Sequence, residues 1–305
     1  MAGDLMSDIK LFRMSGQQAE EIPGTAVALE KSLQTQMEQN LETLLGIRFL
    51  ASEYSTGPKH GGRIDTLGLD ENGNPVIIEY KRTTNENVIN QGLYYLDWLL
   101  DHRAEFELMV MKRLGQEAAD AIDWSAPRLL CIAGGYTRYD EHAVQQINRN
   151  IELMRYRRFG EELLLLELVN AISAAPTAVT DSGTTALTKT VSQTVEELTG
   201  SLADLYEELR AYLLALGDDV QVKTLKHYVA FKRIKNFTCL EPHPNKGCIT
   251  CYIKVNPDSI SLEQGFTRDV RNIGHYGTGD LEIKIHNNDE LEKAKTLFHN
   301  SYESA

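Results

Sequence analysis

Two carboxylates and a lysine lie on two apolar segments that are separated by a turn. Residues 63–69 and 75–81 have the composition of short strands, and residues 70–75 read Asp-Glu-Asn-Gly-Asn-Pro, which favours a hairpin turn. Asp65 can therefore lie beside Glu79, and Lys81 points to the same face as Glu79 because side chains alternate along a strand. The fold must place these charges together in strands that are otherwise apolar.

Such a group of charges suits a hard divalent cation. Mg²⁺ prefers carboxylate and water oxygens, and two acidic ligands, Asp65 and Glu79, leave positions for water and a phosphate oxygen. The metal would stabilise the phosphorus centre during attack, and Lys81 would orient the water or offset phosphate charge. The alternative is a surface hairpin with a Glu–Lys pair, which contributes little stability. Ile77 and Ile78 favour a central strand instead, where unneeded charges are expensive.

The order of these residues resembles the PD-(D/E)XK nuclease superfamily. Asp65 is followed, after thirteen residues, by Glu79-Tyr80-Lys81. Gln91 and Tyr95 then lie one turn apart on a helix expected over residues 86–101, as in the Q-x3-Y motif of RecB-type members. The resemblance implies a restriction-endonuclease-like α/β/α core with a mixed sheet. It also implies a metal held by the two carboxylates, with the lysine, glutamine and tyrosine as further catalytic residues beside the nucleic-acid backbone.

Members of this superfamily often add an acidic residue from the helix before the first strand. Residues 26–46 have leucine and methionine at helical spacing. Glu38 borders the apolar face near Leu45, whereas Glu42 lies further round toward solvent. We favour Glu38 as the assisting carboxylate and keep Glu42 as the alternative; either residue is equally consistent with an ordinary solvated glutamate.

The chain is long enough for two domains. At 305 residues it exceeds one average domain, and we expect a nuclease-like domain over 1–170, a flexible linker over 171–195 and a smaller α+β domain over 196–305. Further helices of the first domain are expected over 103–121 and 140–150, and further strands over 128–133, 152–158 and 162–168. The second domain is expected to have strands near 227–234, 236–242, 248–255 and 280–286 and a helix over 288–300.

The two-domain layout resembles a bacterial family formerly labelled predicted transport proteins, in which a PD-(D/E)XK-like domain precedes a domain of unknown function. The matching stretches are residues 62–81 and the loop Gly274-His275-Tyr276-Gly277-Thr278-Gly279-Asp280. The second domain would recognise a ligand or partner, or mediate a homodimer. Its loop residue His275 is a candidate base, although a histidine between glycines is more often a contact residue.

Charge and hydropathy limit the partners. The net charge of −13 argues against a broad basic surface for nucleic acid, so local cations near the site, Arg63, Arg82 and Lys59, would have to contact the backbone. No apolar run approaches the about eighteen residues that span a bilayer, and the first residues lack the features of a signal peptide. We expect a cytoplasmic protein that binds nucleic acid and no membrane.

Four potential zinc ligands lie close together in the second domain: Cys239, His243, Cys248 and Cys251. The spacing of Cys248 and Cys251 is zinc-like. However, residues 248–253 alternate as a strand, so these two cysteines would face opposite ways. The pattern favours buried thiols over a zinc site.

Two functions follow from these observations. The first is an Mg²⁺-dependent nuclease, with Mn²⁺ as a second metal, that hydrolyses phosphodiester bonds of DNA, with RNA as the alternative, in defence or repair. The second is a catalytically silent module that binds nucleic acid or protein, with the second domain as a sensor of a ligand or partner. The complete set of motif residues favours the first function, and the acidic net charge favours the second.

Overall fold

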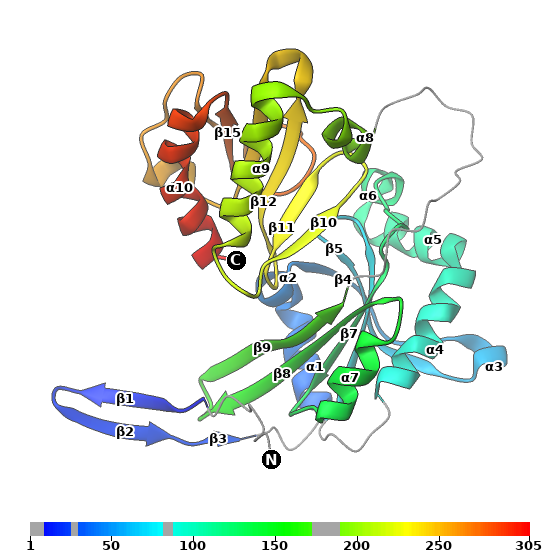
Figure 1. The fold of residues 1–305 in the computed structure, drawn as a ribbon. Coiled ribbons are helices and arrows are strands. Elements are labelled where there is room, and N and C mark those ends of the chain that lie inside the picture. Colours follow the sequence, from blue (N-terminus) through cyan, green and yellow to red (C-terminus); the bar gives the residue numbers. More distant parts are fainter. Residues whose placement is uncertain (1–8, 26–29, 82–87, 173–189) are drawn as a thin grey trace. The chain divides into compact units, whose positions relative to one another are not determined.

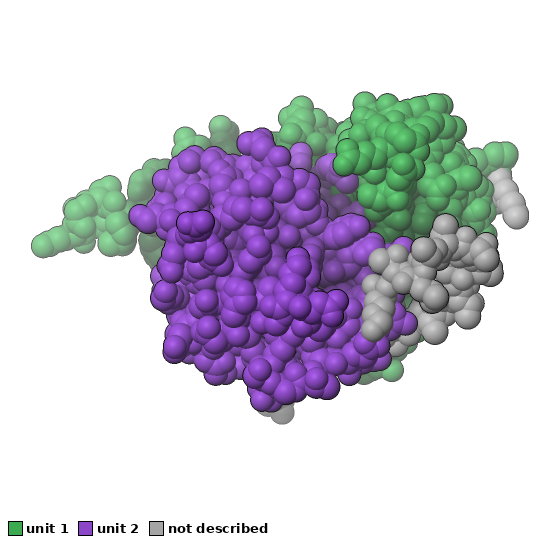
Figure 2. All heavy atoms as spheres, turned by 90° about the horizontal axis from the view of Figure 1, so that it is seen from above, with its two compact units in different colours: residues 1–41, 49–69, 74–177 green, residues 42–48, 70–73, 178–305 purple. Residues whose placement is uncertain are grey.

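The computed structural model describes residues 9–25, 30–81, 88–172 and 190–305 (Figure 1). It divides the chain into two compact units, coloured separately in Figure 2. Unit 1 comprises residues 1–41, 49–69 and 74–177, and unit 2 comprises residues 42–48, 70–73 and 178–305. Helices and a mixed sheet in the first part, and helices with a further sheet in the second, confirm the predicted α/β class.

Unit 1 is built on a seven-stranded mixed sheet. Its strands are β3 (Gly24–Thr25), β4 (Ile47–Ser55), β5 (Arg63–Asp70), β6 (Pro75–Lys81), β7 (Arg128–Ala133), β8 (Asn150–Phe159) and β9 (Leu163–Ile172). The order is β3-β8-β7-β6-β5-β4, with β9 also paired to β8. β6, β7 and β8 are parallel, whereas β5 and β9 run antiparallel to their neighbours β6 and β8. A two-stranded sheet of β1 (Leu11–Ser15) and β2 (Gln18–Ile22) precedes it.

The helices in this part of the chain are α1 (Glu30–Gln39), α2 (Leu41–Leu45), α3 (Gly57–His60), α4 (Val88–Asp101), α5 (Arg103–Leu114), α6 (Gln116–Asp120) and α7 (Arg138–Gln145). The expected helix over 26–46 is divided into α1 and α2 at Asn40, whose side-chain amide donates to the carbonyl of Gln36. The expected helix over 103–121 is divided into α5 and α6 at Gly115, which has a φ of 95° that a helix cannot contain. The helix expected over 140–150 spans 138–145 instead.

α4 and α1 contact opposite faces of the sheet. A Cβ on Gly92 of α4 would lie 2.4 Å from the side chain of Leu129 on β7, so the helix packs directly on that side. Leu129 shares a core cluster with Leu67, which is two residues from Asp65 on β5. Thr66, which lies between Asp65 and Leu67 on β5, instead donates a hydrogen bond to Glu38 of α1. Because side chains alternate along β5, Asp65 belongs to the α4 face.

Unit 2 contains a six-stranded antiparallel sheet with the order β10-β11-β12-β13-β15-β14. Its strands are β10 (Gln221–Thr224), β11 (Val229–Lys232), β12 (Asn236–His243), β13 (Cys248–Ile253), β14 (Thr267–Asp269) and β15 (Leu281–Ile285). The helices α8 (Val191–Glu196), α9 (Gly200–Leu214) and α10 (Asn288–Glu303) share a core with it. The strands β10 and β14 were not among those expected from the sequence.

The expected linker over 171–195 falls mainly on residues 173–189, which lie outside the described residues. Its described ends are not linker: residues 171 and 172 complete β9, and residues 191–195 belong to α8. A capping box begins α8, because Thr190 Oγ1 accepts from the Gln193 backbone and Gln193 Oε1 accepts from the Thr190 backbone. The sparse charge of the segment concealed this helix start.

The glycine-rich loop of residues 274–280 is held by ring stacking. His275 stacks on Tyr252 with ring centroids 4.1 Å apart. Gly279 has a φ of 149°, and a Cβ there would lie 2.5 Å from the backbone of Ile253. Gly277 is similarly close to Cys239, at 2.6 Å. The motif therefore has a structural explanation in the close approach of this loop to β13 and β12.

None of the helices in the described ranges is both long and apolar enough to cross a bilayer.

Candidate functional site

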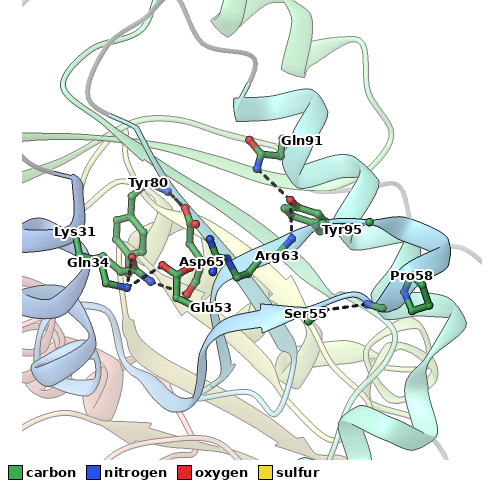
Figure 3. Close-up of a pocket in the computed structure, with 13 residues that line it drawn as sticks. Lys31, Gln34, Glu53, Ser55, Pro58, Arg63, Asp65, Tyr80, Gln91 and Tyr95 are labelled. Carbon is green, nitrogen blue, oxygen red and sulfur yellow. Dashed lines mark hydrogen bonds and ion pairs between the residues drawn. The ribbon is translucent and has the colours of Figure 1, made fainter.

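The two predicted carboxylates meet where the pairing of β5 with β6 ends. The register runs from Leu69 opposite Pro75 to Thr66 opposite Ile78. At the next position, Glu79 Oε1 accepts a hydrogen bond from the Asp65 backbone N–H at 3.2 Å. Asp65 Oδ2 accepts from the backbone N–H of Tyr80 at 3.0 Å (Figure 3). At this point the two carboxylates accept the backbone hydrogen bonds that carbonyl oxygens accept elsewhere in the ladder, and both carboxylates therefore lie close together.

Glu79 is a fully buried carboxyl group with an unsatisfied oxygen. Its side chain is 0% exposed, and Oε2 has no hydrogen-bond partner among the described residues. Burial, reinforced by the negative charge of Asp65, raises the pKa of Glu79 to about 9. An oxygen of this kind is costly to leave unpaired, so the site has a buried carboxyl oxygen that a cation would satisfy once it displaced the proton.

Lys81 is the last residue of β6 and lies two residues beyond Glu79, on the same face of the strand. Its positive charge acts to lower the pKa of Glu79, against the larger effect of burial. The structure therefore brings the predicted Asp65, Glu79 and Lys81 together.

Gln91 and Tyr95 of α4 are bonded to each other. Tyr95 Oη accepts from Gln91 Nε2 at 3.1 Å and from the Arg63 backbone N–H at 3.1 Å (Figure 3). A tyrosine hydroxyl has one hydrogen of its own to donate. Since both of its partners among the described residues are donors, the hydroxyl hydrogen of Tyr95 remains available to an acceptor in the space beside Arg63.

The two glycines before Arg63 have different structural roles. Gly61 ends α3 in the left-handed region, with a φ of 59°. Gly62 lies against the ring of Tyr95, where a Cβ would approach to 2.5 Å. The base of this loop is closed at Thr56, whose backbone N–H donates to the Gly62 carbonyl at 3.0 Å. Gly61 is therefore required by the turn, and Gly62 by the close packing against Tyr95.

These elements surround a cleft of about 1010 Å³ within unit 1. Figure 3 shows side chains from α1, β4, β5 and α4 directed toward it. The lining residues are Lys31, Gln34, Glu53, Ser55, Gly57, Pro58, Gly61, Gly62, Arg63, Asp65, Tyr80, Gln91 and Tyr95. Asp65 therefore contributes to the wall, whereas Glu79 lies buried behind it.

Glu53 of β4 is a cleft residue that sequence reasoning missed. Its Oε1 lies 2.8 Å from Lys31 Nζ, and its Oε2 lies 2.8 Å from Arg63 Nε. The hydrogen bond from Lys31 holds the pKa of Glu53 below its usual value. Among the described residues, Glu53 is the single non-glycine residue with a positive φ, 53°. Strain of this kind often accompanies a functional site, and no local sequence signal indicates it.

Glu38, the predicted helix carboxylate, is not among the residues that line the cleft. Glu38 Oε1 accepts from Thr66 Oγ1 at 2.6 Å and from Gln34 Nε2 at 3.0 Å. Thr66 points to the opposite face of β5 from Asp65, so Glu38 does not join the carboxylate pair or the lining of the cleft. α1 presents Gln34 instead, whose Nε2 donates to the Asp65 carbonyl at 2.8 Å. The reserve residue Glu42 is exposed on α2.

Of the three cations expected to contact nucleic acid, Arg63 lines the cleft and is paired with Glu53. Arg82 lies outside the described residues, as does the side chain of Lys59. Lys31, which was not among the expected residues, supplies a second described cation to the cleft.

The four candidate zinc ligands do not form a site. Cys251 belongs to the core shared with the helices of unit 2, whereas Cys239 belongs to a separate cluster with Tyr252. His243 and Cys248 are paired at the far end of β12 and β13. Throughout the described ranges, no three His, Cys, Asp or Glu side chains are placed to hold a metal ion together. The carboxylates Asp65 and Glu79 are therefore a two-residue set.

Residues 191–305 match the model of a family described as a domain of unknown function, DUF5655. An uncharacterized protein of Haemophilus influenzae is 28% identical to the chain over 301 residues, which cover 95% of this chain and 98% of that protein.

Two solved structures are also similar to part of the chain. The crystal structure of a repair endonuclease from Pyrococcus abyssi matches with a TM-score of 0.28 and 18% identity, over 43% of this chain and 48% of that chain. The structure of an EndoMS–dsDNA complex matches with a TM-score of 0.28 and 19% identity, over 43% and 47%. The chain spans about half the length of each of these structures.

Proposed function

We propose that the protein is a metal-dependent phosphodiesterase that hydrolyses nucleic acid. One observation carries this proposal: the buried Glu79 has an unsatisfied Oε2 and is hydrogen-bonded to Asp65, with Lys81 on the same face of β6. A structural salt bridge would not leave a fully buried carboxyl oxygen unpaired, because such an oxygen destabilises the fold.

Asp65 and Glu79 fit a hard divalent cation such as Mg²⁺ or Mn²⁺. Mg²⁺ is usually bound through one or two carboxylates, with water and substrate phosphate as the other ligands, so a two-residue set is sufficient. When bound, the cation would stabilise charge on the phosphate and lower the pKa of water. Oε2 of Glu79 and the outward side of Asp65 are the oxygens that would hold it.

The other cleft residues suit a phosphodiester. The free hydroxyl hydrogen of Tyr95 can donate to a non-bridging phosphate oxygen, as can Lys31 and Arg63. Lys81 would hold the attacking water. The oxygen of this water would form the new bond to phosphorus and lose one proton to solvent, while the bond from phosphorus to one sugar oxygen would break and that sugar oxygen would take up a proton from solvent. These roles use groups that already face or adjoin the cleft.

We propose DNA as the substrate, with RNA as the alternative. The cations that line the cleft are few, and the net charge is −13. Binding should therefore depend on a small number of phosphate contacts, and its salt dependence should be shallow.

A cleavage assay tests the proposal. Single- and double-stranded DNA and RNA are incubated with Mg²⁺, Mn²⁺ or chelator, using wild type, Asp65→Asn, Glu79→Gln and Lys81→Ala. The control is Asp97→Asn, which changes an exposed carboxylate on α4 with a side chain that is 70% exposed. Metal-dependent cleavage should fall at least about a hundred-fold in the three site variants and stay unchanged in the control. Cleavage that is unaffected by Glu79→Gln would contradict the proposal.

The net charge of −13 favours a second candidate, a catalytically silent module in which the C-terminal part senses a ligand or partner. It predicts nucleic-acid or protein binding without cleavage on any substrate of the panel, with or without metal.

A further inference from the structure

A series of aromatic rings leads from the cleft to the surface of unit 1. Tyr95, which lines the cleft, has its ring centroid 6.2 Å from that of Tyr94. The ring of Tyr94 lies 5.3 Å from that of His60 on α3. His60 in turn meets His102 edge-on at 5.8 Å, and His102 stacks on Trp98 at 4.8 Å.

The rings of this series differ in exposure. Tyr95 and Trp98 are buried at 5% and 2% exposure, and they complete the core under α4. Tyr94 is 47% exposed although both of its neighbours in the series are aromatic. Its ring is therefore braced from two sides while part of it faces solvent. The buried members account for the packing of α4, and the exposed part of Tyr94 adds nothing to that packing.

The position of Tyr94 relates it to the cleft. Its neighbour Tyr95 lines the cleft, and its other contact, His60, ends the short helix that begins at the lining residues Gly57 and Pro58. Tyr94 and His60 are not among the lining residues, but each adjoins one of them, Tyr95 and Gly61, so a strand whose phosphate occupied the cleft would have these rings next to its path. Aromatic rings bind a nucleobase through its flat face, without sequence preference, because every base has such a face.

We propose that Tyr94, braced by His60, is a stacking site for an unpaired base of the nucleic-acid strand held in the cleft. In a duplex both faces of each base are covered by its neighbours, so the site selects single-stranded or locally unpaired nucleic acid. This inference rests on the proposed function for its ligand, and it narrows the substrate class.

The test compares binding by fluorescence anisotropy in chelator, so that no cleavage occurs. The probes are a single-stranded oligonucleotide as DNA and as RNA, the matching blunt duplex, and the single strand with abasic positions. The proteins are wild type, Tyr94→Ala, Tyr94→Phe and the control Tyr139→Ala, which removes a tyrosine on α7 that is 69% exposed. Thermal unfolding of each variant confirms that the fold is kept.

Tyr94→Ala should weaken single-strand binding by about 5- to 150-fold, the effect of one stacked base. Tyr94→Phe and Tyr139→Ala should bind as wild type, duplex binding should change less, and abasic positions should abolish the difference between wild type and Tyr94→Ala. Equal loss on single strand and duplex, or no loss, would overturn the inference.

The outcomes separate the two proposals. Cleavage with metal but unchanged binding by Tyr94→Ala would remove the stacking site and leave the phosphodiesterase standing. Binding that depends on Tyr94 but is not followed by cleavage with any metal would support the stacking site and contradict the phosphodiesterase. No binding to any probe would overturn the stacking site outright.

Discussion

Asp65 and Glu79 are linked by two reciprocal hydrogen bonds between their strands. Glu79 Oε1 accepts a hydrogen bond from the backbone N–H of Asp65, and Asp65 Oδ2 accepts one from the backbone N–H of the residue after Glu79. The position of each carboxylate therefore depends on the other. Amide substitutions keep an acceptor at each position, whereas alanine removes it, so Asp65→Asn and Glu79→Gln separate loss of an ionisable carboxyl from loss of geometry.

Binding of a divalent cation should release a proton from Glu79. Burial raises the pKa of this group to about 9, so at pH 7 its carboxyl carries a proton that a metal must displace. Mn²⁺ affinity should therefore rise about tenfold per pH unit between pH 6 and 8. Calorimetry in buffers of different ionisation enthalpy measures the proton, which Glu79→Gln should eliminate and Asp97→Asn should not. Equal proton release by wild type and Glu79→Gln would place the metal elsewhere.

Gly62→Ala should destabilise unit 1 through Tyr95. A Cβ on Gly62 would lie 2.5 Å from the Tyr95 ring, and we expect a loss of about 1–3 kcal/mol in the free energy of unfolding. In a Tyr95→Ala background the loss should largely disappear. Gly61→Ala is the matched control: it meets nothing within 4 Å but has a φ of 59°, so its strain should persist in both backgrounds. Additive effects of Gly62→Ala and Tyr95→Ala in denaturant titrations would argue against this contact.

Replacing Glu53 with glycine, but not with alanine, should relieve backbone strain. Its φ of 53° favours glycine, so Glu53→Gly should be more stable than Glu53→Ala by about 1 kcal/mol. Both variants remove one negative charge beside Lys31 and Arg63, so both should bind oligonucleotides more tightly than wild type in chelator at low salt. Thermal unfolding and anisotropy measure the two effects. Equal stability of the glycine and alanine variants would show that the strain is absent in solution.

Glu241 should make unit 2 less stable as pH rises. Burial, with the negative charge of Glu282, raises the pKa of Glu241 to about 7 despite the opposing charge of Lys246, and its Oε1 is buried without a hydrogen-bond partner among the described residues. The folded state therefore holds the proton more tightly than the unfolded state. The stabilisation is complete below pH 4.5, the ordinary pKa, and is lost as pH rises to about 7, by up to about 1 kcal/mol per pH unit.

Glu241→Gln should flatten this dependence between pH 5 and 8, as measured by scanning calorimetry. The exposed Glu263→Gln, with a side chain that is 57% exposed, should keep the slope of wild type. A slope that survives Glu241→Gln would assign it to another group.

The carboxylate pair could be predicted from sequence because strand alternation and a turn are local properties. β5, β6, β7 and α4 followed from the same kind of pattern. β4 did not, because its buried positions, Ile47 and Leu50, are not two residues apart and its C-terminal half contains the left-handed Glu53. Because β4 was not predicted, Glu53 was not predicted as a residue of the site either.

The choice of residue on α1 could not be made from sequence for a different reason. Helical spacing gives the apolar face, but it does not give the rotation of the helix against β5. That rotation directs Gln34 to Asp65 and Glu38 to Thr66. Lys31 reaches the cleft through its pairing with Glu53, a contact across separate elements that no spacing rule contains.

The closed base of the loop between Thr56 and Gly62 has an engineering consequence. Thr56 and Gly62 are joined by the Thr56 backbone N–H to the Gly62 carbonyl, and by the Gly62 N–H to Thr56 Oγ1, each at 3.0 Å. The intervening residues form one wall of the cleft, yet their attachment points are fixed independently of what lies between them. This wall can be exchanged as a unit: libraries of sequence and length placed between Thr56 and Gly62 can vary which ligands the cleft admits while leaving Asp65 and Glu79 in place.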